Sequence, residues 1–255
     1  MSELSGQFTE DAFLGSKLRL RQLKSGHRAG HDAMLLAAAT SAQSGDRVVD
    51  LGAGVGAAGL ALAKRVAGIE LVLVEIDGTL AELARGNALA NTIAAEVVVL
   101  DVTSAAAEFA AAGLPPDSVD VVLMNPPFND SARHRASPDQ AREIAHVATD
   151  ATLEGWIHAA RRILKSGGVL TMIWRADGLA ELLAALGRGF GSLAILPVHG
   201  DAASPAIRVL VRAIKGGKAP LRLHAALILN NETAMPNPQV QDILAGKGVL
   251  PLALQ

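Results

Sequence analysis

The chain has 255 residues, carries a net charge of −2 at pH 7 and contains no cysteine. This length is typical of one large domain, and the lack of cysteine excludes a disulfide scaffold, thiolate zinc sites and a cysteine nucleophile. Half of the residues are hydrophobic and 19% are charged, which excludes general disorder, and the near-neutral charge excludes a uniformly basic nucleic-acid binder.

Neither the N-terminus nor any apolar run predicts a targeting or membrane segment. The first seven residues lack the basic and apolar regions of a signal peptide, and no apolar run reaches the roughly 18 residues that a membrane span needs. We therefore expect a cytoplasmic protein that binds no membrane. The seven histidines show no paired spacing typical of metal ligands, so no metal site is expected.

Strand-like and helix-like segments alternate through the middle of the chain. We expect strands at 48–51, 70–76, 97–100, 119–124, 169–174, 193–198 and 207–214, and helices at 57–66, 79–90, 153–164 and 179–186. Runs that are apolar on both faces and alternate with helices predict an α/β fold with a mostly parallel sheet covered on both sides. The last two strands have a short connection with Pro205 and no helix, so they should form an antiparallel hairpin at one sheet edge.

Three parts of the chain follow from this pattern. Residues 46–215 form the predicted core. Residues 1–45 hold a short hairpin around 13–20 and a helix from 31 to about 41. Residues 216–255 hold one more apolar run, at 221–229, and an irregular tail, and we expect this C-terminal extension to pack on the core.

A glycine-rich loop lies between the expected strand 48–51 and the following helix. Glycines let the backbone approach a ligand closely, and the free amides at a helix N-terminus bind polar groups. Gly54, Gly56 and Gly59 have the spacing of the dinucleotide fingerprint, and Glu75 follows about 20 residues later. By itself, the loop leaves open an oxidoreductase that uses NAD.

The most specific motif is Asn125-Pro126-Pro127-Phe128, directly after the expected strand 119–124. Two prolines fix the backbone, so Asn125 is held at the strand end and the carbonyl of Pro126 is free to accept. Two such acceptors can hold both hydrogens of an exocyclic amine and direct its lone pair toward a methyl donor. Phe128 offers a ring on which a base can stack. These four residues are the predicted catalytic group.

The string Asp50-Leu-Gly-Ala-Gly-x-Gly resembles motif I of class I S-adenosylmethionine methyltransferases. The tetrapeptide resembles that of an amino-methyltransferase group with adenine-N6, guanine-N2 and glutamine enzymes. The resemblance implies S-adenosylmethionine as cofactor and a Rossmann-like, seven-stranded sheet whose last strand is antiparallel. It also implies that Asp50 orients the loop and the methionine amine, Glu75 accepts the ribose hydroxyls and Asp101 accepts the adenine amine. The implied cofactor-binding residues are Asp32, Asp50, Gly52, Ala53, Gly54, Gly56, Glu75, Ile76, Asp101, Val102 and Asn125.

Residues 23–37 resemble the segment before motif I in bacterial tRNA-valine adenine-N6 methyltransferases. In those enzymes this segment closes over the cofactor. Asp32 matches, whereas His31 replaces a threonine. Residues 1–45 are therefore expected to cover the cofactor site. The implied reaction is methyl transfer to an exocyclic amine of a nucleobase, adenine N6 in tRNA, by a monomer or homodimer.

Basic clusters agree with an RNA partner, although a solvated face explains any one of them equally well. Arg28, Arg133 and Arg135 are the predicted substrate-binding residues. Five alternatives remain: rRNA guanine-N2 methylation, protein-glutamine methylation, O-methylation (a label given to proteins with this layout), NAD-dependent oxidoreduction, and a non-enzymatic RNA-binding module.

Overall fold

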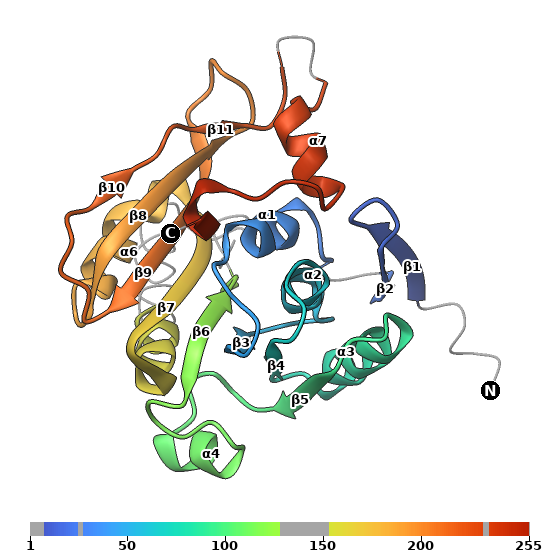
Figure 1. The fold of residues 1–255 in the computed structure, drawn as a ribbon, viewed down its shortest axis with the longest axis vertical. Helices are drawn as coiled ribbons and strands as arrows, with labels where there is room; N and C mark the ends of the chain where they lie inside the picture. Colours follow the sequence, from blue (N-terminus) through green and yellow to red (C-terminus); the bar gives the residue numbers. More distant parts are fainter. Residues whose placement is uncertain (1–7, 25–27, 128–152, 232–234, 255) are drawn as a thin grey trace, which may run out of the picture.

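A computed structural model describes residues 8–24, 28–127, 153–231 and 235–254. Its centre is a sheet with the strand order β10-β8-β9-β7-β6-β3-β4-β5, with β11 also paired to β8 (Figure 1). The seven long strands are β3 (Arg47–Leu51), β4 (Glu70–Glu75), β5 (Ala95–Val99), β6 (Val119–Met124), β7 (Leu164–Arg175), β8 (Phe190–His199) and β9 (Ala206–Lys215).

The pairing directions confirm the expected mostly parallel sheet. The strands β5, β4, β3, β6 and β7 run parallel, whereas β9 is antiparallel to both β7 and β8. Strand β7 begins five residues earlier than the pattern predicts, because the stretch before Val169 has no β signal and is held by pairing between Leu164 and Val119.

All seven predicted strands are present, and the described residues add two short strands, so that the sheet has nine. The two extra strands, β10 (Arg222–Leu223) and β11 (Leu227–Ile228), come from the C-terminal extension and pair in parallel with the outer edge of β8. They cover an edge that would otherwise expose unpaired backbone groups. Two-residue strands leave no periodic signal in a sequence, so only the fold reveals them.

Alternate side chains of the central strands enter two separate cores. Val48 packs with α1 (His31–Ala39), α2 (Ala57–Arg65) and α3 (Gly78–Ala90) on one face. Val49 packs on the other face with α4 (Ala106–Ala111), the helix at 153–163 and α6 (Leu179–Leu186). Because successive side chains of such a strand point into different cores, the strand is buried on both sides and its sequence is continuously apolar. No helix in the described part of the chain is both long and apolar enough to cross a membrane.

The N-terminal segment adds a separate hairpin of β1 (Phe8–Phe13) and β2 (Leu18–Leu23). In β2, Leu18 and Leu20 are fully buried in the core of α1, α2 and α3, while Arg19 and Arg21 face solvent. Helix α7 (Pro238–Leu244) and the short 3₁₀ helices Ala176–Gly178 and Pro251–Leu254 complete the described elements. Leu250 and Leu252 from the C-terminal end are buried in the core of α1.

Candidate functional site

Four neighbouring strands bring the predicted site residues to one edge of the sheet. Leu51 pairs with Met124 of β6 and with Val74 of β4, and Glu75 pairs with Val99 of β5. The chain segments that follow these strands therefore emerge side by side. They carry the glycine loop, Asn125, Ile76 and Asp101. Open α/β sheets bind ligands at this carboxyl edge.

The backbone of the glycine loop has positive φ angles at three positions, and each of them favours glycine. Gly52, Gly54 and Gly56 have φ values of 71°, 57° and 85°, which other residues adopt only with strain. The amides of Gly52 and Ala53 donate to the carbonyl of Val74 at 2.8 and 2.9 Å. A Cβ at Gly52 would lie 2.3 Å from the ring of Trp156, whereas one at Gly54 would meet nothing within 4 Å. The ring of Trp156 thus packs against the loop at Gly52, whereas the space at Gly54 is open. A ligand that contacts the backbone can approach the loop there.

Asp50 is buried beneath this loop. Its Oδ2 accepts the amide of Gly59 at 2.8 Å, and its exposed fraction is 2%. Burial raises the pKa of the Asp50 carboxyl to about 7, the amide of Gly59 opposes this rise, and the charge of Glu75 adds to it. Asp50 therefore links the end of β3 to the start of α2. This bond can fix the orientation of the loop between them.

Glu75 and Asp101 also bind backbone at their own strand ends. Glu75 is buried, and its two carboxylate oxygens accept the amides of Gly54 at 2.7 Å and Asp77 at 2.9 Å. Oδ1 of the exposed Asp101 accepts both the amide and the hydroxyl of Thr103, at 2.7 and 2.8 Å. Each carboxylate has further lone pairs, so both remain able to accept from a ligand.

Apolar side chains lie next to these two carboxylates. Ile76 follows Glu75 and is 63% exposed, whereas Val102 follows Asp101 and is buried. An exposed isoleucine can pack against the face of a planar ring, whereas a buried valine cannot be reached in the same way. The roles of Ile76 and Val102 in cofactor binding stay predictions.

Asn125 differs from the three carboxylates. Its Oδ1 atom is buried and has no hydrogen-bond partner among the described residues. Pro126 behind it is buried and Pro127 is exposed. A buried acceptor without a partner is costly, so it is expected where a ligand supplies the missing donor. Phe128, Arg133 and Arg135 lie outside the described residues.

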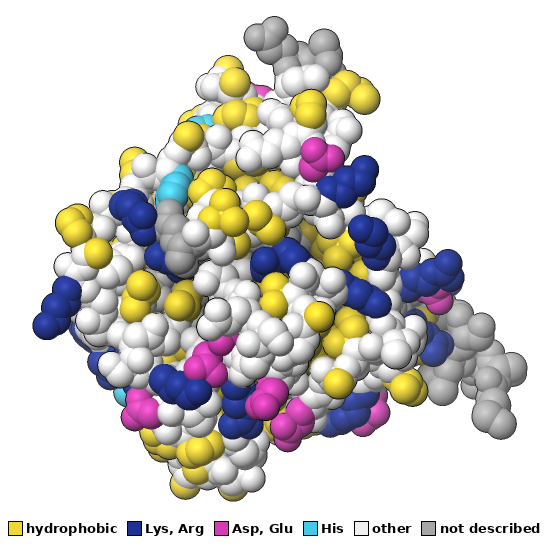
Figure 2. Space-filling model, viewed as in Figure 1, with side chains coloured by type: hydrophobic (Ala, Val, Ile, Leu, Met, Phe, Trp, Pro, Cys, Tyr) yellow, Lys and Arg dark blue, Asp and Glu magenta, His cyan; other side chains and the backbone are white. Residues whose placement is uncertain are grey.

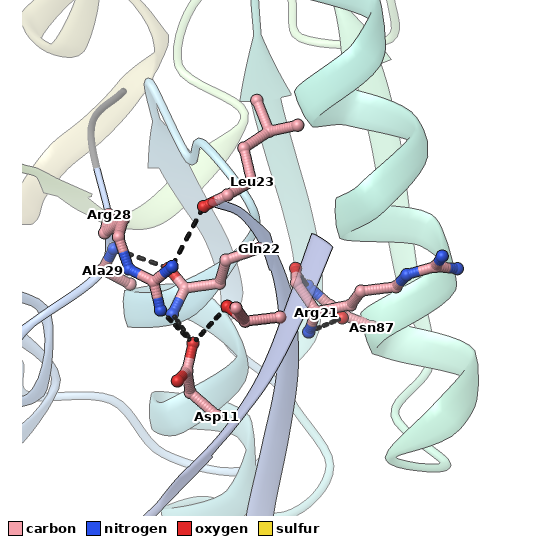
Figure 3. A network of polar contacts seen from close by, with 8 residues as sticks. Asp11, Arg21, Gln22, Leu23, Arg28, Ala29 and Asn87 are labelled. Carbon is pink, nitrogen blue, oxygen red and sulfur yellow. Dashed lines mark hydrogen bonds and ion pairs between the residues drawn. The ribbon is translucent and has the colours of Figure 1, made fainter. Parts of the chain in front are cut away.

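Arg28 and Asp32 lie in the segment that precedes the core. The guanidinium of Arg28 donates to Oδ2 of Asp11 at 2.6 Å and to the carbonyl of Leu23 at 3.1 Å (Figure 3). Gln22 connects the same network, because its Nε2 donates to Asp11 and its Oε1 accepts the amide of Ala29. Arg28 thus holds the hairpin to the start of α1, and its role in binding substrate stays a prediction.

Asp32 has a partner that the sequence does not suggest. Its Oδ2 accepts Nε of Arg208 on β9 at 2.9 Å, and both side chains are about 31% exposed. Arg208 is 176 residues away in the chain, so no local pattern could reveal the pair. The ion pair ties α1 to the hairpin of β8 and β9.

One cavity is lined by Val102, a predicted cofactor-binding residue, but by no residue of the glycine loop. It has a volume of about 410 Å³ and lies between the segment after β5, the helix at 153–163 and the end of α6. Thr103 and Arg162 line it, but Asp50, Glu75 and Asn125 do not. We place the candidate site at the strand ends, because the polar groups converge there.

Comparison with known proteins gives the family. The methyltransferase small domain matches residues 25–199. A tRNA1(Val) (adenine(37)-N6)-methyltransferase of Porphyromonas gingivalis is 29% identical over 68% of this chain and 68% of its own length. A release factor glutamine methyltransferase of Chlorobaculum tepidum is 27% identical over 64% of this chain and 58% of its own length.

Solved structures agree in fold. A protein of Agrobacterium tumefaciens described as a predicted O-methyltransferase is 36% identical, with a TM-score of 0.71 over 86% of this chain and 98% of that one. A Thermus thermophilus 16S rRNA N2 G1207 methyltransferase bound to AdoMet and guanosine has a TM-score of 0.56 at 22% identity, over 82% of this chain and 50% of that one, and shows the fold alone. The fold is thus the Rossmann-like one of class I methyltransferases, and the chain is an enzyme that belongs to the methyltransferase small domain family.

Proposed function

We propose that the protein transfers a methyl group from S-adenosylmethionine to an exocyclic amine of a nucleobase, adenine N6 in tRNA. The observation that carries this proposal is the buried Oδ1 of Asn125 just after β6, which has no hydrogen-bond partner among the described residues. An amine has two hydrogens to donate, and Oδ1 of Asn125 together with the carbonyl of Pro126 offers two acceptors. The NAD-dependent oxidoreductase and the non-enzymatic module are set aside, because the family is one of methyltransferases.

The residues at the strand ends fit S-adenosylmethionine. Gly54 leaves open space above the loop, Glu75 can accept from a ribose diol, and Asp101 can accept from the adenine amine. Asp50, directly beneath the loop, would orient it toward the methionine amine. The bound cofactor would supply a methyl group on a positively charged sulfur, which reacts with a nucleophile without a metal or a redox step.

Catalysis by this chain would then be positioning. The lone pair of an exocyclic amine is delocalised into its ring, and holding both hydrogens out of the ring plane localises it. Oδ1 of Asn125 can take one hydrogen and the carbonyl of Pro126 the other, and the two prolines keep these acceptors in place. The methylated nitrogen would carry a positive charge and would be strongly acidic, so one of its two hydrogens would pass to water as a proton. This mechanism therefore needs no strong base.

An RNA substrate has two supports. Several relatives are named as tRNA adenine-N6 methyltransferases, among them one of Bacteroides thetaiotaomicron at 32% identity over 59% of this chain. Figure 2 shows several Lys and Arg side chains over the N-terminal hairpin and the adjacent α1–α2 face. Such side chains can bind phosphates even on a protein whose net charge is slightly negative.

O-methylation is the second candidate, and one observation favours it. The structure with a TM-score of 0.71 is described as a predicted O-methyltransferase. A hydroxyl substrate has one hydrogen and needs a base rather than two acceptors. Asn125 and Pro126 therefore favour the amine.

The product decides between the candidates. Purified protein with S-adenosylmethionine labelled in its methyl group would be incubated with total RNA and total protein from a strain that lacks this gene. We expect label in tRNA and, after digestion, in N6-methyladenosine. Label on a guanine amine, a glutamine or an oxygen would identify one of the other acceptors and overturn the adenine assignment.

Cofactor binding gives an independent prediction. We expect Glu75→Ala to weaken S-adenosylmethionine binding by about 10- to 100-fold, because charged hydrogen bonds to two hydroxyls are lost. Glu70→Ala, at the exposed start of the same strand, is the matched control and should bind normally. Isothermal titration calorimetry measures both. Unchanged affinity in folded Glu75→Ala protein would remove Glu75 from the site.

A further inference from the structure

Asn87 of α3 and Asn91, the residue that caps the C-terminal end of α3, hold the N-terminal hairpin. Oδ1 of Asn87 accepts the amide of Arg21 at 2.7 Å, and its Nδ2 donates to the carbonyl of the same residue at 3.1 Å (Figure 3). Asn91 binds the amide and carbonyl of Arg19 in the same way, at 3.0 and 2.7 Å. Both asparagines are buried, whereas Arg19 and Arg21 are exposed, so the four bonds are partly shielded from water.

The spacing of helix and strand explains this pairing. Four residues of a helix rise about 6 Å, and two residues of a strand span about 6.6 Å. Successive turns of α3 therefore meet alternate residues of β2. The two side-chain amides take the place of a neighbouring strand along the edge of β2 that β1 leaves open.

Asn87 makes one more bond, and this bond reaches the glycine loop. Its Nδ2 donates to the carbonyl of Val55 at 2.9 Å. Val55 stands between Gly54 and Gly56. The remaining bond of Asn91 instead stays within the helix, from its Nδ2 to the carbonyl of Asn87 at 2.8 Å. Of the two asparagines, only Asn87 binds the loop.

The loop is thus held from two sides. Glu75 accepts the amide of Gly54, and Asn87 donates to the carbonyl of the next residue, Val55. An amide nitrogen has two hydrogens, and Asn87 uses one for β2 and one for the loop. Without the bond from Asn87, the peptide between Val55 and Gly56 would be held only by the bond from the amide of Gly56 to the carbonyl of Ala53, at 2.8 Å.

We propose that Asn87 is a positioning residue for cofactor binding, which fixes the carbonyl of Val55 and couples the hairpin to the glycine loop. The amides of Gly54 and Gly56 already donate to Glu75 and to the carbonyl of Ala53, so the bond to Asn87 helps to fix the direction of the remaining loop amide, that of Val55. The proposal rests on the proposed function, because it takes the glycine loop as the binding site of S-adenosylmethionine.

The test compares Asn87→Ala with Asn91→Ala. Each variant loses two hydrogen bonds to β2, but only Asn87→Ala loses the bond to Val55. We expect both to lower Tm, while calorimetry shows S-adenosylmethionine affinity about tenfold weaker in Asn87→Ala and within about twofold of wild type in Asn91→Ala. Hydrogen exchange in the free protein should be faster at residues 52–60 in Asn87→Ala alone.

Equal cofactor affinities in the two variants, or equal exchange at residues 52–60, would overturn the proposal. If Asn87→Ala does not fold, Asn87→Asp replaces it, because its oxygen still accepts the amide of Arg21 but cannot donate to Val55. Failure of the proposed function would look different: wild-type protein would not bind S-adenosylmethionine, while the exchange difference between the variants would persist.

Discussion

The two ends of the candidate site differ in how the protein uses their polar atoms. On the cofactor side, Asp50, Glu75 and Asp101 each accept at least one backbone amide from a neighbouring loop. At the end of β6, the buried Oδ1 of Asn125 accepts nothing from the described residues. Under the proposed function, the three carboxylates shape the loop and also bind the cofactor, whereas Oδ1 of Asn125 binds only the ligand. Mutation on the cofactor side should therefore change stability, and mutation of Asn125 should change turnover.

The largest expected effect concerns Asp50 and pH. In the folded protein its pKa is raised from 3.8 to about 7, so between these values the folded chain binds more protons at Asp50 than the unfolded chain. The free energy of unfolding must then fall as pH rises through this window, by on the order of 4 kcal/mol in all, and stay level above it. Asp50→Asn lacks this titration yet can still accept the amide of Gly59.

Urea unfolding of both proteins at several pH values measures the effect. The stability of Asp50→Asn relative to wild type should rise steadily up to about pH 7, because only wild type loses stability there. Other titrating groups cancel in the difference. A difference that stays constant with pH would show that Asp50 is already ionised in the folded protein.

Asn125→Ala tests the other end of the site. We expect turnover to fall by about 10²-fold or more, as for the loss of one preorganised partner of the reacting group. S-adenosylmethionine affinity should barely change, and the free energy of unfolding should change by less than about 1 kcal/mol, because Oδ1 has no described partner to lose. Single-turnover methylation, calorimetry and urea unfolding measure the three quantities.

Asn125→Asp sharpens this test. Its carboxylate still accepts, so part of the activity should remain if acceptance of the amine hydrogens is the whole role. A loss as large as in Asn125→Ala would show that the Nδ2 group is also needed. Near-normal turnover of Asn125→Ala, or a methyl group on oxygen, would replace the amine assignment with O-methylation.

Local signals were enough to predict the parts of the site that one strand and the following loop define. The run of β6 ends at Met124 because Pro126 and Pro127 cannot continue a sheet, and the glycine spacing places the turn before α2. Acidic residues at the ends of β4 and β5 could be placed at one edge because parallel strands share their carboxyl ends.

Contacts between distant segments were not predictable. Asn87 looks like one polar residue on an apolar helix face, and its role depends on Arg21, 66 positions away. The apolar run at 221–229 contains both β10 and β11, but nothing in it reveals that its partner is the open edge of β8. Pairing across such distances follows from the whole fold, because a side chain or a short strand has many equivalent partners in the sequence.

The smallest expected effect concerns the ion pair of Asp32 and Arg208. Mutating each partner in turn distinguishes a structural role of Asp32 from a role in cofactor binding. Both side chains are about one third exposed, so breaking the pair in Arg208→Ala should lower the free energy of unfolding by less than about 1 kcal/mol. If Asp32 binds cofactor, as the resemblance implies, Asp32→Asn should weaken S-adenosylmethionine binding several-fold, whereas Arg208→Ala should bind almost normally. Calorimetry at two salt concentrations distinguishes the two roles, because salt screens a partly exposed charge pair. Equal weakening by both variants would show that the pair acts as a unit that holds α1, and Asp32 would then leave the group of cofactor ligands.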